Sequence, residues 1–281
     1  MEPIKIAGKP FSDKVLTQIR EVVEKEQLHI KIAVILVGDN PASLSYIRKK
    51  QQAAESVGYD FVLIQKETSI TQEELEELVD QLNADQTMTG YIIQMPLPKH
   101  LNSQALIERI APKKDIDGFH PLNIGRLFLG AGEYLPPATA RAIVELLEMY
   151  NIPVEGKHAV IIGRSNIVGK PLSVELINRG ATVTVCNSKT QGLKDITLSG
   201  DIVIAATGNP KLITEDMIKD SAVTIDVGCT FCDGKAVGDI DTENIQNKVK
   251  AYAPVPGGVG PGTVCMLIKN ALTAYRLQHV S

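Results

Sequence analysis

Strand and helix patterns alternate along this chain, and that alternation constrains its fold more than any other feature. In the first half, apolar strands are predicted at 32–37, 61–65 and 91–94, with helices predicted over 42–57 and 71–83 between them. The second of these helices opens with a Thr71-x-x-Glu74 capping box. Alternation with short loops is typical of a mostly parallel sheet covered by helices. Ligands of such sheets lie beyond the carboxyl ends of the strands, so functional residues are expected in the loops that follow.

A second block of the same kind follows a stretch rich in Gly and Pro. Residues 121–137 are predicted to be irregular and to act as a hinge, and a helix is predicted from 138 onwards. Further strands are predicted at 158–162, 181–186, 202–206 and 223–227, before a last helix over 263–277. The pattern therefore predicts an α/β protein built from two α/β domains.

The domain boundaries are expected where the two blocks meet. The first domain comprises residues 1–137 and is joined by the C-terminal helix 263–281. The second domain comprises residues 138–262 and is predicted to be a Rossmann-like dinucleotide-binding domain.

Composition excludes several function classes. The 281 residues are 44% hydrophobic, enough for a large core, and the net charge of −4 argues against general nucleic-acid binding. The longest aliphatic run, Ile32–Val37, is far shorter than the roughly 20 residues that cross a bilayer. No signal-peptide pattern opens the chain, so we expect a cytoplasmic protein without nucleic-acid or membrane partners.

No metal site is predicted. Cys229 and Cys232 form a C-x-x-C pair, but a zinc site needs a second ligand pair at similar spacing, which the sequence lacks. The five His are scattered without an H-x-x-x-H pair. We expect all four cysteines to be reduced and structural.

The loop after the predicted strand 158–162 is the first candidate ligand site. Gly163 and Gly169 lie between this strand and a helix, a layout that directs backbone N–H groups and a helix N-terminus at a phosphate. Five residues separate the glycines and Pro171 stands where a nucleoside-triphosphate loop has its hydroxyl. G-x-G-x-x-G is absent too. The spacing favours a dinucleotide loop, while an ordinary strand-to-helix turn stays open.

The end of the next strand indicates which dinucleotide would bind. NAD sites usually carry an acidic residue about 20 residues beyond the glycine loop. Here that stretch carries Ser188 and Lys189 without a carboxylate, and Arg164 lies in the loop itself. A cation with a hydroxyl suits a 2′-phosphate, so NADP is favoured over NAD.

A second candidate site lies in the first half. Tyr46 and Lys50 are four residues apart on a predicted helix and therefore share a face. Gln94 ends a strand, and Asp117 follows in a short polar segment. An amine near an amide in an apolar cleft would have a lowered pKa suited to proton transfer. The alternative is that Lys50 belongs to the solvated basic run 48–50.

Together these segments resemble the methylenetetrahydrofolate dehydrogenase/cyclohydrolase family of the bifunctional bacterial FolD type. The similarity spans nearly the whole chain in the family's order, through Val37-Gly-Asp-Asn-Pro-Ala-Ser43, Tyr46-x-x-x-Lys50, Gln94-Met-Pro-Leu-Pro98, Lys114-Asp-Ile-Asp-Gly-Phe119, Gly163-Arg-Ser-Asn-Ile-Val-Gly-Lys-Pro171, Ile225-Asp-Val-Gly228, Gly238-Asp-Ile-Asp241 and Pro254-Val-Pro-Gly-Gly-Val-Gly-Pro261.

The resemblance implies a folate-binding catalytic first domain, an NADP-binding second domain and a cleft between them. It implies that Lys50 transfers protons in the cyclohydrolase step, that Tyr46 packs on the folate, that Gln94 tunes Lys50 and that Asp117 binds the pterin ring. Gly257, Gly258 and Pro261 would line the folate pocket. The cofactor-binding residues implied are Gly163, Arg164, Ser165, Gly169, Ser188, Thr139 and Gly208. A homodimer formed through the second domain is also implied.

Three positions depart from the family's pattern. At the domain junction the cysteine, second proline and glycine of Pro-Cys-Thr-Pro-x-Gly are replaced by Ala138, Ala140 and Ala142. Gly262 stands in place of the usual Met, and Asn187 stands where His is frequent. These differences bear on cofactor affinity and dehydrogenase efficiency.

The expected function is oxidation of 5,10-methylenetetrahydrofolate by NADP⁺, followed by hydrolysis of the methenyl product to 10-formyltetrahydrofolate. Two alternatives stay open at this point. One is an NADP-dependent dehydrogenase with another substrate or without the hydrolase step. The other is a catalytically weak folate- or nucleotide-binding protein.

Overall fold

The computed structural model describes residues 2–232 and 234–279, which divide into two compact units. Unit 1 comprises the residues up to Ser12 together with Thr139–Thr263, and unit 2 comprises Asp13–Ala138 together with the residues from Val264 onwards. Helices α1 (Gly8–Glu26) and α10 (Val259–His279) each contribute several residues to both units. No helix in the described part of the chain combines the length and apolarity needed to cross a membrane.

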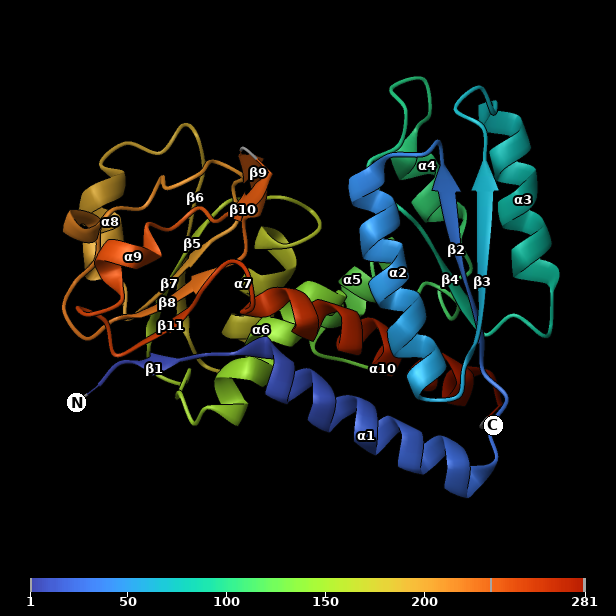
Figure 1. Ribbon diagram of the computed structural model, residues 1–281, viewed down its shortest axis with the longest axis horizontal. Helices are drawn as coiled ribbons and strands as arrows, with labels where there is room; N and C mark the ends of the chain where they lie inside the picture. Colours follow the sequence, from blue (N-terminus) through green and yellow to red (C-terminus); the bar gives the residue numbers. More distant parts are fainter. Residues whose placement is uncertain (1, 233, 280–281) are drawn as a thin grey trace. The chain divides into compact units, whose positions relative to one another are not determined.

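Unit 2 contains a three-stranded parallel sheet in the order β3-β2-β4. Its strands are β2 (Lys31–Val37), β3 (Asp60–Lys66) and β4 (Gly90–Ile93). Helix α2 (Pro41–Ser56) connects β2 to β3, which pairs with one side of β2. Helix α3 (Gln72–Ala84) connects β3 to β4, which pairs with the other side of β2. Because both crossovers are expected to be right-handed, α2 and α3 cover opposite faces of the sheet (Figure 1).

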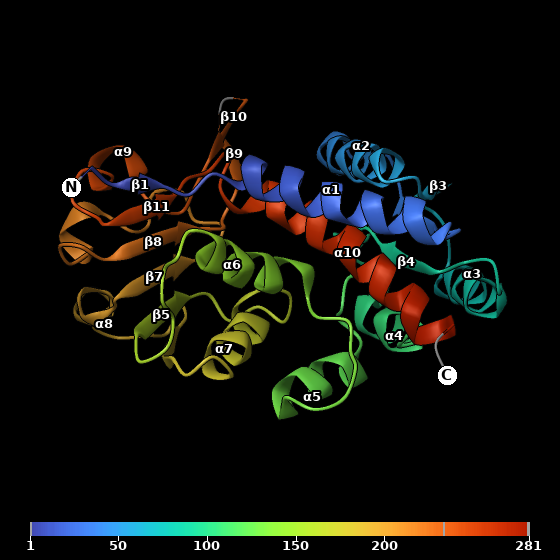
Figure 2. The ribbon, with the colours of Figure 1, turned by 90° about the horizontal axis from the view of Figure 1, so that it is seen from below.

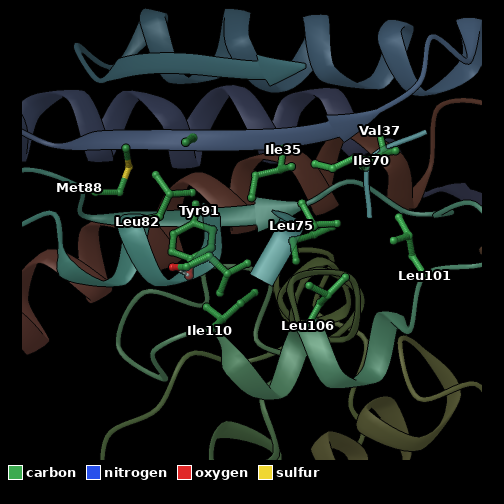
Figure 3. Packing of buried hydrophobic residues seen from close by; sticks show 13 residues of the cluster. Ile35, Val37, Ile70, Leu75, Leu82, Met88, Tyr91, Leu101, Leu106 and Ile110 are labelled. Carbon is green, nitrogen blue, oxygen red and sulfur yellow. Dashed lines mark hydrogen bonds between the residues drawn. The ribbon is translucent and has the colours of Figure 1, made fainter. Parts of the chain in front are cut away.

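One face of this sheet carries the core of unit 2. Leu75 from α3 and Leu106 from α4 (Ser103–Arg109) pack with Ile35 and Tyr91 from the strands (Figure 3). All four side chains are fully buried. The Tyr91 hydroxyl donates to the Asn83 side chain at 2.6 Å, so the one polar atom of the ring is satisfied.

Unit 1 contains a six-stranded parallel sheet in the order β1-β11-β8-β7-β5-β6. Its strands are β1 (Ile4–Lys5), β5 (His158–Ile162), β6 (Thr182–Cys186), β7 (Ile202–Ala205), β8 (Val223–Asp226) and β11 (Ala251–Ala253). Helices α6 (Ala138–Met149) and α7 (Gly169–Ile177) lie on one face, while α8 (Leu193–Ser199) and α9 (Thr242–Ile245) lie on the other (Figure 2). This arrangement confirms the predicted Rossmann-like fold.

The strand order of unit 1 creates a topological switch point. The chain leaves β5 toward β6 on one side and then returns past β5 to β7 on the other. The connections therefore diverge above the carboxyl ends of β5 and β7, which is where doubly wound sheets bind their ligands.

Capping residues mark the starts of two helices of unit 2, within one residue of the predicted starts. Asn40 caps α2 by accepting hydrogen bonds from the N–H groups of Ala42 and Ser43, and Pro41 occupies its first position. Thr71 and Glu74 form the predicted capping box of α3.

The prediction that residues 121–137 are wholly irregular is wrong. Pro121–Leu129 forms a helix, α5, which His120 caps through a 3.0 Å hydrogen bond from the N–H of Leu122. Gly130 ends it in the left-handed conformation, with φ of 60°. The same Pro and Gly that suggested a hinge thus mark the two ends of a short helix.

Several short elements of unit 1 were not predicted, because two to four residues carry too little periodicity. They are β1, β11, α9, the 3₁₀ helix Glu215–Met217 and the hairpin strands β9 (Thr230–Cys232) and β10 (Lys235–Val237). Cys186 and Cys265 are buried, as expected of structural cysteines, whereas Cys229 and Cys232 on this hairpin are exposed.

Two departures from the family pattern contact each other. Ala142, in α6, and Gly262, in α10, are so close that a Cβ atom on Gly262 would lie 3.2 Å from that of Ala142. Ala138, Ala140 and Ala142 are all buried in the first turns of α6. A methyl group at position 142 is accommodated because position 262 has no side chain.

Candidate active site

Lys50 is a buried lysine on the inner face of α2. The buried residues of this helix recur at helical spacing and comprise Ser43, Ile47, Lys50, Ala53 and Ala54. Arg48 and Lys49 point to solvent, whereas Lys50 is 8% exposed. The alternative that Lys50 is one member of a solvated basic run is therefore wrong for this residue.

Gln94 holds the amine of Lys50. The Lys50 Nζ donates to the Gln94 Oε1 at 3.0 Å. The other side of the same amide is fixed, because the Gln94 Nε2 donates to the carbonyl of Met95 at 2.8 Å. The amide oxygen consequently faces Lys50. Because the Gln94 amide is neutral, it does not stabilise the charged form of the amine as a contacting carboxylate would.

Asp117 is the charged group that acts on Lys50. Burial lowers the pKa of the Lys50 amine from its ordinary value of 10.5, and the Asp117 carboxylate opposes this by raising it. Burial in turn raises the pKa of Asp117, which the charge of Lys50 opposes. Desolvation is the larger cause for both groups, so the neutral forms of both are favoured relative to their states in water.

Tyr46 lies one turn before Lys50 on α2. Its side chain is 39% exposed, although tyrosine rings tend to be more deeply covered. Lys49 places its Nζ 5.5 Å from the centroid of the ring. The ring thus presents a flat, partly exposed apolar surface one turn before Lys50 on the same helix.

The segment that carries Asp117 is held by two buried polar side chains that the sequence analysis did not single out. Asp115 is 2% exposed and accepts hydrogen bonds from the N–H groups of Gly118 and His120 at 3.1 and 2.7 Å. Asn123 donates to the same carboxylate at 3.1 Å. Burial raises the pKa of Asp115 to about 6, and these hydrogen bonds oppose the rise. Asp115 stands two residues before Asp117, which was the only available signal.

The adjoining residues fix the segment further. Lys114 is buried and donates to three carbonyls at the end of α3, those of Leu82, Asn83 and Asp85, at 2.7 to 3.0 Å. Gly118 has a φ of 79°, and a Cβ there would lie 2.5 Å from the carbonyl oxygen of Pro136. The position after Asp117 therefore accepts only glycine.

In unit 1 the dinucleotide loop has the geometry of a close-packed backbone turn. Gly163 has a φ of 121°, and a Cβ there would lie 2.3 Å from the carbonyl oxygen of Ala206. A Cβ on Gly169 would lie 2.0 Å from the carbonyl oxygen of Gly163. Both glycines are required for the loop to close over the switch point, and α7 begins at Gly169 without a side-chain cap. In this first turn the N–H of Lys170 donates to the carbonyl of Ser165 at 3.1 Å, and Pro171 has no N–H.

The residues predicted to bind the 2′-phosphate lie on neighbouring loops. Arg164 and Ser188 are exposed, and they follow the adjacent strands β5 and β6. The two loops are joined where the N–H of Gly163 donates to the carbonyl of Cys186 at 2.9 Å. Within residues 2–232 and 234–279 the Arg164 guanidinium makes no hydrogen bond or ion pair, so it is available to an anionic ligand.

The remaining predicted residues also lie in unit 1. The Ser165 hydroxyl accepts from the N–H of Val168 at 3.1 Å and shapes the glycine loop. Thr139, in the first turn of α6, accepts from the Thr263 hydroxyl at 3.2 Å. Gly208 follows β7 with a φ of 74°. Gly257, Gly258 and Pro261 follow β11, where the carbonyl of Gly257 accepts from the N–H of Gly8 at 2.8 Å.

The predicted site residues thus form two groups. Tyr46, Lys50, Gln94 and Asp117 are brought together in unit 2. The cofactor residues and the loop of Gly257, Gly258 and Pro261 belong to unit 1. Thr139 lies in α6, and the others come after the carboxyl ends of parallel strands. No group of His, Cys, Asp and Glu suited to a metal is found among the described residues.

This combination defines a two-domain α/β protein with a buried lysine held by an amide in one unit and a glycine loop at the switch point of a Rossmann-like sheet in the other. The family models described as tetrahydrofolate dehydrogenase/cyclohydrolase, catalytic domain, and as its NAD(P)-binding domain match residues 6–117 and 137–279. The chain belongs to the tetrahydrofolate dehydrogenase/cyclohydrolase family.

Individual relatives agree over the full length. The bifunctional protein FolD of Bacillus pumilus is 48% identical over 275 residues, which cover 96% of this chain and 97% of that protein. The crystal structure of the bifunctional enzyme FolD from Campylobacter jejuni is 41% identical with a TM-score of 0.94, covering 97% and 99% of the two chains. The Trypanosoma brucei enzyme, solved with NADP and an inhibitor, is 33% identical with a TM-score of 0.94 and covers 100% of both chains.

The opposing effects on the Lys50 pKa can be measured separately. Because Asp117 raises the pKa of Lys50, Asp117→Asn should lower that pKa further below 10.5. NMR titration of the lysine Cε signals measures it, and Lys50→Met identifies the signal by its loss. A Lys50 pKa that rose or stayed constant in Asp117→Asn would contradict the electrostatic description of this pair.

Proposed function

We propose that this chain carries out two successive reactions on folate. First, 5,10-methylenetetrahydrofolate and NADP⁺ give the 5,10-methenyl cation and NADPH. Then the methenyl cation and water give 10-formyltetrahydrofolate and a proton. The observation that carries the proposal is the buried Lys50 amine on Gln94, 3.0 Å away, in a chain whose two halves match both domains of the family.

Lys50 is proposed as the proton-transfer residue of the hydrolysis. The neutral amine that burial favours has a lone pair, so Nζ can accept a proton from the attacking water and release it later. Gln94 holds the amine in place without adding a charge that would raise its pKa. A carboxylate at position 94 would favour the ammonium, which cannot act as a base.

Tyr46 and Asp117 are proposed to orient the folate. The exposed ring of Tyr46 offers a stacking surface for a flat heterocycle beside the amine. Asp117, held by the Asp115 framework, offers carboxyl oxygens to the N–H groups of a pterin ring. Gly257, Gly258 and Pro261 are proposed to contact the folate from their own unit.

The dinucleotide residues are proposed to bind NADP. Gly163 and Gly169 bring the backbone close to the phosphates, and the Ser165 and Thr139 hydroxyls and the loop at Gly208 complete the site. Arg164 and Ser188 supply a cation and a hydroxyl for the 2′-phosphate. When bound, NADP⁺ accepts the hydride from the methylene carbon. The residues present fit this cofactor because both glycines let the loop close tightly on backbone carbonyls at the switch point, with the Arg164 and Ser188 side chains exposed beside it.

The domain assignment is part of the proposal. Residues 1–137 with helix 263–281 would be the folate-binding domain, and residues 138–262 the NADP-binding domain. In the structure the first 12 residues group with the second of these, since β1 pairs with β11.

We further propose a cytoplasmic homodimer. Strand β6 forms an edge of the sheet, and Val185 on it and Ile177 before it are 38% and 55% exposed, which favours pairing with a second copy. All four cysteines lie among the described residues and none forms a disulfide, which favours a reducing compartment.

Removal of the Lys50 amine should separate the two reactions. Lys50→Met keeps the aliphatic stem, so hydrolysis of the methenyl compound should fall by roughly 10²–10⁴-fold while NADPH formation persists. Methenyl product should then accumulate in an assay that follows both species in one sample. Lys49→Met, the exposed neighbour, is the matched control and should hydrolyse normally. Hydrolysis at the wild-type rate in Lys50→Met would refute the assignment.

Removal of the Arg164 guanidinium should affect NADP⁺ more than NAD⁺. Arg164→Ala loses a charged hydrogen bond to the 2′-phosphate, worth about 1.5–3 kcal/mol of binding free energy. NAD⁺ lacks that phosphate and serves as the internal control in the same variant. Steady-state KM values for both cofactors provide the measurement, and equal losses for both would place Arg164 elsewhere in the site.

A further inference from the structure

Two buried aspartates in unit 1 have no role in the chemistry described above. Asp226 ends β8 and is 1% exposed, and Asp239 lies in the segment after β10 and is 0% exposed. Neither forms an ion pair with any residue in the described part of the chain. A buried carboxylate without a cation is costly, so its retention calls for an explanation.

Asp226 fixes the backbone that carries Asp239. Its two oxygens accept hydrogen bonds from the N–H groups of Asp239 and Ile240, both at 2.9 Å. Each carboxylate also occupies the space beside a glycine. A Cβ on Gly238 would lie 1.9 Å from an oxygen of Asp226, and a Cβ on Gly228 would lie 2.1 Å from Asp239. This packing explains the Asp-x-Gly and Gly-Asp pairs in the two motifs.

Asp239 in turn holds the loop after β7. Its Oδ2 accepts hydrogen bonds from the N–H and hydroxyl of Thr207 and from the N–H of Gly208, the last at 3.1 Å. Its Oδ1 is buried and makes no hydrogen bond within the described residues. All three bonds therefore converge on one oxygen.

The loop held in this way lies at the switch point of the sheet. Its first residue, Ala206, donates from its N–H to the carbonyl of Ile162 at the end of β5, at 2.8 Å. The carbonyl of Ala206 is also the atom that excludes a side chain at Gly163. The loop and the dinucleotide loop thus pack directly on each other where the two connections diverge.

We propose that Asp239 is a positioning residue for the dinucleotide: it fixes Thr207 and Gly208 so that the loop after β7 forms one wall of the NADP site, and Asp226 fixes Asp239. The inference rests on the proposed function, since it assumes that NADP binds at this edge. No cation pairs with these aspartates among the described residues. Burial and the neighbouring Asp239 raise the pKa of Asp226 to about 7, so Asp226 can hold a proton near neutral pH.

The unequal use of the two oxygens suggests a conservative variant. In Asp239→Asn the amide oxygen can take the place of Oδ2 and keep all three hydrogen bonds, while the NH₂ group takes the place of the unpartnered Oδ1. Asp239→Ala removes all three bonds. Thr207→Val removes only the hydroxyl and keeps the shape of the side chain. Asp216→Ala, at an exposed aspartate of the same unit, is the control.

The experiment measures NADP⁺ binding by calorimetry and hydrolysis of methenyltetrahydrofolate, which needs no cofactor, for each variant. Asp239→Ala should weaken NADP⁺ binding by about 10- to 100-fold and Thr207→Val by about threefold to tenfold, in line with the number of hydrogen bonds lost. Asp239→Asn and Asp216→Ala should bind NADP⁺ as the wild type does. Hydrolysis should stay near the wild-type rate in every variant.

Four outcomes would overturn the inference. Unchanged NADP⁺ binding in Asp239→Ala would refute it, with the proposed function intact if the wild type binds NADP⁺. A parallel loss of binding and hydrolysis would show a general structural role instead. If Asp239→Ala fails to fold, unchanged binding in Thr207→Val decides against the inference. A wild-type protein that does not bind NADP⁺ would refute both the inference and the proposed function.

Discussion

The burial of one amine is the constraint on which the first site depends. Taking the charge of Lys50 out of water favours its neutral form, and only a neutral amine can accept a proton. A contacting carboxylate would reverse this, so the direct partner is the amide of Gln94 and the charge of Asp117 acts only through the field. The surrounding elements serve that arrangement. Helix α2 buries Lys50 on the face of Ile47, and β4 ends where Gln94 reaches it.

A second theme is that buried carboxylates hold the functional loops of both units. Asp115 gathers backbone N–H groups around the turn that carries Asp117, and Asp239 does the same for the loop after β7. Each loop also packs against a glycine. A Cβ atom on Gly228 would overlap the carboxylate of Asp239, and a Cβ atom on Gly118 would overlap the backbone of Pro136. Such loops cannot rely on a sheet or helix for their hydrogen bonds, so charged acceptors supply them instead.

Much of the fold was predictable because the long elements carry strong periodic signals. The parallel sheets, the capping box of Thr71 and the helical face shared by Tyr46 and Lys50 followed from local pattern. The helix α5 was missed because its Pro and Gly are equally typical of an irregular hinge. The site residues followed from motif resemblance, but the burial of Lys50 against exposed Lys49 did not, since both belong to one basic run. Asp115 and Asp239 were overlooked because their role depends on backbone groups that only the folded chain brings near.

The pH dependence of hydrolysis tests the central claim most directly. If the neutral amine of Lys50 accepts the proton, the enzymatic rate should rise with pH through a midpoint below 10.5, the ordinary pKa of lysine. The rate measured with Lys50→Met supplies the uncatalysed background to be subtracted. A midpoint at or above the ordinary value would contradict the account, because the amine would then remain charged throughout the working range.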